Sequence, residues 1–165
     1  MNIPSTPQAL TSEWLTYALR ETGIINQAKV KSFEITALGD EQGITGQLVR
    51  LALSYDINEE NTPQSIIAKF PSTDPEELEI MFTLTYHYER EVRFYEKIAA
   101  RINLRTPQCY YSALNVDARE YVLLLEDLTP APCGNWAARL SKQNSPSGKS
   151  QNFIPFGGRV QNLPR

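Results

Sequence analysis

A lysine inside a short apolar strand is the first residue whose placement points to chemistry. Lys69 lies in the run Ser65–Phe70, in which all residues except Ser65 and Lys69 itself are apolar. An ammonium group is almost never left among apolar side chains without a partner. We therefore expect Lys69 to bind an anion, although a lysine that extends its charged end into water from a strand edge gives the same pattern.

A glutamate downstream is a second charged residue in apolar surroundings. Good helix formers from Glu76 to roughly Ile102 predict one long helix, with Glu91 near its apolar face. A carboxylate in such surroundings needs a charged or hydrogen-bonding partner. The same face carries His87, Phe94, Tyr95 and Ile98, and we expect His87 to be satisfied locally and not to be a ligand. The charged residues Glu89, Arg90, Arg93, Glu96 and Lys97 are expected to face water.

Three glycines stand between two predicted strands, at Gly39, Gly43 and Gly46. Glycine lets backbone N–H groups come close to a ligand, and such groups can hold phosphates. A plain hairpin with bulges is the alternative, and the glycines by themselves favour it.

A buried strand with an acidic end follows later in the chain. The continuous apolar run Tyr121–Leu125 predicts a fully buried strand. It ends in Glu126, Asp127 and Leu128. Taken alone, the two acids are best explained as an ordinary polar strand end.

The remaining elements predict an α+β fold. Thr11 or Ser12 can cap a short amphipathic helix that Gly23 ends. Alternating residues predict one strand with Phe33, Ile35 and Ala37 as its buried face, a second over 49–55, and an extended segment over 109–114. The order gives a sheet of about five antiparallel strands with an N-terminal helix and one long packed helix.

This order resembles the smaller, N-terminal lobe of protein-kinase-like folds. The sequence is similar in particular to the ecdysteroid-kinase-like and aminoglycoside-phosphotransferase-like family, which are relatives of choline kinases. The resemblance covers about residues 1–133. The stretches that carry it are Trp14-Leu15, Gly43–Gly46 with Val49–Leu51, Ile67–Lys69, Arg90–Tyr95, Thr106-Pro107 with Cys109–Tyr111, and Leu123–Leu128. The most specific are Arg90–Tyr95 and Leu123–Leu128.

The resemblance implies an ATP-dependent phosphotransferase whose acceptor is a hydroxyl group on a small molecule. In such proteins Lys69 would contact the phosphates, Glu91 would orient Lys69, and the glycine loop would cover the phosphates. Backbone groups of Glu126–Leu128 would form the hinge that holds adenine. The loop departs from the kinase pattern because it reads G-x-x-x-G-x-x-G.

The catalytic parts of this family are expected to be missing. The resemblance implies an H-x-D loop, whose aspartate acts as general base, and a later aspartate for Mg²⁺. His87 is the only histidine, and no acid follows Asp127. We therefore expect a truncated chain that is inactive alone, with catalytic residues and metal ligands absent and ATP binding weak or absent.

A composition shift near Cys133 predicts a boundary. All 19 acidic residues precede residues 134–165, which carry five basic ones. Their Gly, Asn, Ser, Gln and Pro content predicts a disordered tail. Relatives in this family usually carry a stretch like A-K-F-H-x-x-W-W after the hinge. Read one nucleotide earlier, codons for Phe153–Gly158 are compatible with H-S-F-W-W after a shared phenylalanine. We therefore expect 1–133 to be the lobe and the tail to be an out-of-frame translation, with a genuine short tail as the alternative.

Composition limits the other classes of function. A net charge of −3 gives no basic field for nucleic acid, and no apolar run is long enough for a membrane span. The polar N-terminus predicts a cytoplasmic protein. Cys109 and Cys133 stand far apart, which argues against structural zinc. The alternatives to the truncated enzyme are a non-catalytic nucleotide-binding or protein-interaction module and an unrelated α+β domain.

Overall fold

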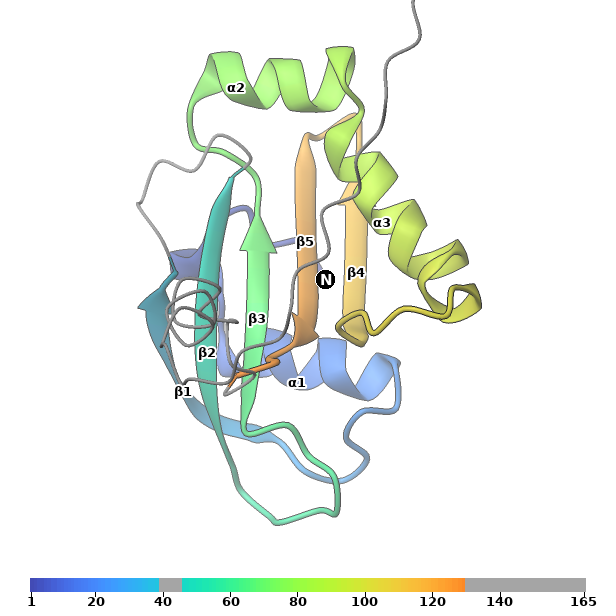
Figure 1. Ribbon diagram of the computed structural model, residues 1–165. Helices are drawn as coiled ribbons and strands as arrows, with labels where there is room; N and C mark the ends of the chain where they lie inside the picture. The colour runs from blue at the N-terminus through green and yellow to red at the C-terminus, as the bar shows by residue number, and fades with distance from the viewer. Residues whose placement is uncertain (39–45, 130–165) are drawn as a thin grey trace, which may run out of the picture. The chain divides into compact units, whose positions relative to one another are not determined.

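The computed structural model describes residues 1–38 and 46–129 (Figure 1). Residues Met1–Leu128 form a compact α+β unit. Its five-stranded sheet has the order β1-β2-β3-β5-β4, and all neighbouring strands are antiparallel. The elements are η1 (Pro7–Ala9), α1 (Ser12–Glu21), β1 (Val30–Ala37), β2 (Gln47–Tyr55), β3 (Ser65–Phe70), α2 (Pro75–Glu79), η2 (Ile80–Leu84), α3 (His87–Lys97), η3 (Ala99–Arg101), β4 (Cys109–Asn115) and β5 (Glu120–Glu126). The predicted α+β class and antiparallel sheet are confirmed.

Helix α1 forms where its caps and apolar spacing predict it. The Thr11 hydroxyl oxygen accepts a hydrogen bond from the Trp14 N–H at 3.1 Å, which satisfies one unpaired donor of the first turn. Beyond the last turn, Gly23 takes a left-handed conformation with φ of +71°, which glycine adopts without steric cost. The buried face of the helix consists of Trp14, Leu15, Ala18 and Leu19.

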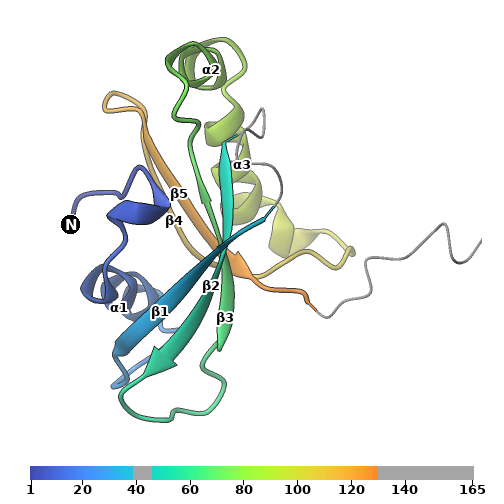
Figure 2. The ribbon, with the colours of Figure 1, turned by 90° about the vertical axis from the view of Figure 1, so that its left-hand side faces the viewer.

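The sheet separates two apolar clusters, one on each face, and Figure 2 shows the helices on opposite sides of it. The first cluster lies under α1 and includes Leu51, Ile66 and Leu124. The second lies under η2 and α3 and includes Tyr88, Val92 and Leu123. Because side chains alternate along a strand, β3 sends Ile66, Ala68 and Phe70 to the first face and Ile67 and Lys69 to the second.

The predicted long helix over 76–102 is wrong, because the chain forms four shorter elements there, α2, η2, α3 and η3. A π-helical turn, η2, follows α2, and its Thr85 N–H donates to the Ile80 carbonyl at 3.0 Å. Tyr86 then adopts left-handed angles, φ 50° and ψ 36°, before α3 begins. The hydroxyl of Thr83 donates to the Glu79 carbonyl at 2.6 Å. Such local side-chain bonds compete with regular helix geometry and bend helices.

The predicted buried face of β1 is only partly covered. Phe33 is half-buried and Ile35 is 42% exposed. Strand β1 lies at the edge of the sheet, and it meets α1 near Val30, whose N–H donates to the Thr16 hydroxyl at 2.9 Å. Phe33, Ile35 and Ala37 pair in register with buried residues of β2, so they share the core-side face, but the prediction that they are buried is wrong for Ile35 and Ala37. The covering helix does not extend along the whole strand.

Two predictions lie outside the described residues. The tail 134–165 falls there entirely, and so does most of the glycine loop, including Gly39 and Gly43. Within 1–38 and 46–129, no helix combines the length and apolar character needed to cross a membrane.

Candidate functional site

Lys69 stands on the face of β3 that carries α3. It pairs in register with Leu48 of β2 on one side and Leu123 of β5 on the other. Neighbouring residues in register share a face of the sheet, so the lysine lies between two leucines. Its side chain is 20% exposed. A lysine that merely extended into solvent from a strand edge would have a bare ammonium, but β3 is an inner strand and the ammonium has a partner.

That partner is Glu91 of α3. The Lys69 Nζ donates to Glu91 Oε1 at 2.5 Å and to Oε2 at 2.7 Å. The Lys69–Glu91 ion pair that the family resemblance implies is therefore present, and it joins residues 22 positions apart. The Glu91 side chain is 21% exposed, so both charges are largely removed from water and hold each other in place.

A tyrosine donates a further hydrogen bond to the same carboxylate. The Tyr121 hydroxyl donates to Glu91 Oε2 at 2.8 Å. Burial, and then the charge of Glu91, raises the pKa of Tyr121, so that the phenol stays a neutral donor. Tyr121 stacks on Tyr88 with ring centroids 4.5 Å apart, and the Tyr88 hydroxyl accepts from the Ser72 N–H at 3.0 Å. Sequence reasoning had assigned Tyr121 only to a buried strand.

The described glycine of the loop has a packing role. Gly46 has φ of +113°, and a Cβ on it would lie 2.2 Å from the Phe70 carbonyl oxygen. Only glycine allows β2 to begin this close to the end of β3. Gly46 is therefore required by the backbone, and its predicted part in phosphate binding stays a prediction.

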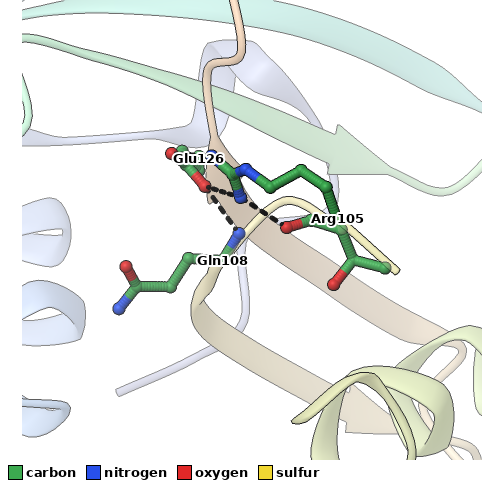
Figure 3. A network of polar contacts seen from close by, with 4 residues as sticks. Arg105, Gln108 and Glu126 are labelled. Carbon is green, nitrogen blue, oxygen red and sulfur yellow. Dashed lines mark hydrogen bonds and ion pairs between the residues drawn. The ribbon is translucent and has the colours of Figure 1, made fainter. Parts of the chain in front are cut away.

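The carboxylate of Glu126, at the end of β5, is bound by groups of the protein itself, as Figure 3 shows. Arg105 forms a forked pair with this carboxylate at 2.6 and 2.9 Å, and the Gln108 N–H donates to it at 3.0 Å. The Arg105 hydrogen bond, and next that of Gln108, lower the pKa of Glu126. The Glu126 N–H donates to the Gln108 carbonyl at 2.8 Å. The side chain and the N–H of Glu126 are thus both used within the protein.

Asp127 is held in the same way, by the opposite strands. It accepts from Arg50 Nε at 2.8 Å and from the Ser65 hydroxyl at 2.5 Å, and its side chain is 6% exposed. Leu128 follows, half-buried. Because both carboxylates have partners, the explanation of Glu126 and Asp127 as a structural strand end is supported for their side chains. The hinge prediction concerns main-chain groups of Glu126–Leu128 and stays a prediction.

The predicted site residues therefore form two groups on one strand pair. Lys69, which contacts Glu91, pairs in register with Leu123. Glu126 pairs in register with Ile66. Three residues of strand separate the two positions, or about 10 Å. This separation suits a ligand as long as a nucleoside with its first phosphates.

An open cavity of about 490 Å³ adjoins the ion pair. It is lined by Lys69, His87, Arg90, Glu91, Phe94 and Tyr95. His87 makes an edge contact with the Tyr88 ring. Arg90 is exposed, as predicted, but it also lines this cavity, which sequence reasoning missed. Its spacing, three residues after His87 and four before Phe94, was the available signal.

Comparisons with protein-family models, with curated proteins and with solved structures find no match to this chain. Within the residues that the structure describes, no group of three or more His, Cys, Asp or Glu side chains could hold a metal ion. Any function must therefore be argued from the geometry given above.

Proposed function

We propose that this chain is the phosphate-holding, N-terminal lobe of an ATP-dependent phosphotransferase that acts on a hydroxyl group of a small molecule. The observation that carries the proposal is the forked contact between Lys69 and Glu91, at 2.5 and 2.7 Å. A strand lysine oriented by a helix glutamate is the arrangement by which kinase-like folds hold nucleotide phosphates. The kinase-like identity of the sheet and helices is part of this proposal.

The surroundings of Lys69 suit a nucleotide. Leu48, in register with the lysine, is 36% exposed, and Ile67 is half-buried on the same face. Apolar side chains that remain partly exposed beside a cation can take the flat faces of a base while the cation takes the phosphates. Main-chain groups of Asp127 and Leu128, which follow Glu126 at the end of β5, are the proposed contacts of the adenine edge.

In this proposal the chain's contribution is positioning and charge. Lys69 would neutralise and hold a phosphate oxygen, and Glu91 and Tyr121 would keep Lys69 in one position. Mg²⁺, which the resemblance implies, would offset phosphate charge when bound, and we expect this chain to supply no ligand for it. Residues after Asp127 include no Asp, Glu or His, so we expect no phosphoryl transfer by the purified 165-residue chain.

Titration calorimetry with ATP tests the proposal. Lys69→Met removes the ammonium at nearly constant volume, and Lys31→Met, at an exposed position of β1, is the matched control. We expect weak binding that Lys69→Met abolishes and Lys31→Met leaves unchanged. Equal binding by all three proteins, or none by the wild type, would refute the nucleotide site.

A second candidate is a nucleotide-binding module without catalysis. It is favoured by the single histidine and by the absence of acids after Asp127. Both candidates predict no phosphoryl transfer by this chain, and a radiolabelled transfer assay with a panel of small alcohols and amino alcohols checks that expectation. Transfer above the rate of the Lys69→Met variant would contradict both candidates.

A further inference from the structure

The ion pair leaves unused hydrogen-bond donors at the cavity. An ammonium has three N–H donors, and Glu91 accepts two of those of Lys69. No acceptor among the described residues takes the third. Tyr121 donates to the same carboxylate, so Glu91 is satisfied without moving. A ligand oxygen can therefore join Lys69 while the ion pair stays intact.

Arg90 is the second cation of this cavity. Its N–H backbone group donates to the Tyr86 carbonyl at 2.9 Å, as a helical residue requires. Its guanidinium, in contrast, has no hydrogen-bond or ion-pair partner among residues 1–38 and 46–129. The next arginine of α3 differs in this respect, because Arg93 pairs with Glu89 on the helix surface.

The charges around the cavity leave it cationic. Lys69 and Glu91 cancel, and Arg90 adds one positive charge. Phe94 and Tyr95 add aromatic walls and His87 adds an imidazole. A guanidinium presents a planar fork of donors that matches the oxygens of a phosphoryl group. One ammonium donor and one such fork in a shared cavity match a ligand with several anionic oxygens better than a single carboxylate.

We infer that Arg90 and Lys69 together bind the oligophosphate portion of a ligand in this cavity, with Arg90 as a specificity-determining residue for phosphate number. This rests on the proposed nucleotide site and extends it, because Lys69 and Glu91 by themselves carry no net charge for a second phosphate. The ligand class is an organic or inorganic di- or triphosphate.

Tripolyphosphate, ATP and adenosine are the probes, titrated by calorimetry at one fixed ionic strength because exposed charges are screened by salt. Arg90→Gln removes the charge and keeps a good helix former. Arg93→Gln on the same helix is the matched control, and circular dichroism shows that both variants keep the fold. We expect Arg90→Gln to weaken tripolyphosphate and ATP binding about tenfold or more, with adenosine unaffected. Arg93→Gln should match the wild type.

The outcomes separate this inference from the proposed function. If Arg90→Gln binds tripolyphosphate as tightly as the wild type, or if the wild type binds none, the inference is wrong. ATP binding that still requires Lys69 would in that case leave the nucleotide site standing. A similar loss in Arg93→Gln would show that only the general charge of α3 matters, which also overturns the role of Arg90.

Discussion

The contact between Lys69 and Glu91 should contribute much more to stability than a surface ion pair does. Both side chains are about four-fifths buried, at 20% and 21% exposed, and both carboxylate oxygens are used. Two unit charges 4 Å apart attract by about 4 kcal/mol at an effective dielectric constant of 20. Removing the ions from water costs several kcal/mol per ion, so only part of this attraction remains.

We therefore expect a coupling energy of about 2 kcal/mol for the pair. This value lies between the 0.2–1 kcal/mol typical of exposed pairs and the roughly 3–5 kcal/mol cost of breaking a buried pair. Lys69→Met should destabilise by about 3 kcal/mol, because it leaves a largely buried carboxylate with only the neutral Tyr121 hydroxyl as its partner. Glu91→Gln should cost less, since its amide oxygen still accepts from Tyr121.

The assay is a double-mutant cycle in urea, with Lys69→Met, Glu91→Gln and the double variant compared by their free energies of unfolding. The Glu89–Arg93 pair of the same helix supplies the reference cycle. Arg93 is 61% exposed, and such a helical pair is worth about 0.3–0.5 kcal/mol. If the Lys69–Glu91 coupling is no larger than this reference, the argument that the pair is held together by burial fails.

Two further predictions concern the scaffold around the site. Gly46→Ala should destabilise the protein by about 2 kcal/mol or more, because its Cβ would lie 2.2 Å from a backbone oxygen at φ of +113°. Gly23→Ala, with nothing within 4 Å, should cost less in the same urea titration, and equal costs would contradict the packing role. Glu59 accepts from the N–H groups of Asn26, Ala28 and Gln27, and these bonds, first that of Asn26, lower its pKa. Its stabilising effect is therefore present above the unfolded pKa of about 4.3 and lost as the pH falls through the lower folded pKa. Glu59→Gln should flatten the fall in urea midpoint between about pH 5 and pH 3, and an unchanged slope would contradict this.

The sheet could be predicted because its signals are local. Strict alternation in β2, with Val49, Leu51 and Leu53 buried, and the continuous apolar run of β5 identify an inner strand of each kind. Alternation does not predict burial where the face of a strand must be covered by an element distant in sequence. Ile35 alternates as well as Leu51 does, yet it is 42% exposed because α1 packs only near one end of β1.

The long helix failed for a different reason. Helix propensity summed over residues 76–102 predicts one element, but it does not register how Thr83 and Thr85 bond back to carbonyls of the preceding turn. The break at Tyr86 starts α3 in a new direction. The Lys69–Glu91 contact survived this error, because it depends only on the face of α3 that carries Glu91.

The sequence by itself determined that residue 69 is a lysine needing a partner and that residue 91 is a carboxylate needing one, since both follow from burying charge in an apolar pattern. The strand types, the first helix and its caps were determined locally as well. Only the tertiary structure decided that Tyr121 also donates to Glu91 Oε2, that Arg50 and Ser65 bind Asp127, and that Arg90 lines the cavity. Those contacts join residues 30, 77 and 62 positions apart, or depend on the direction of one helix. No local pattern encodes them, because they exist only after β3 is placed between β2 and β5.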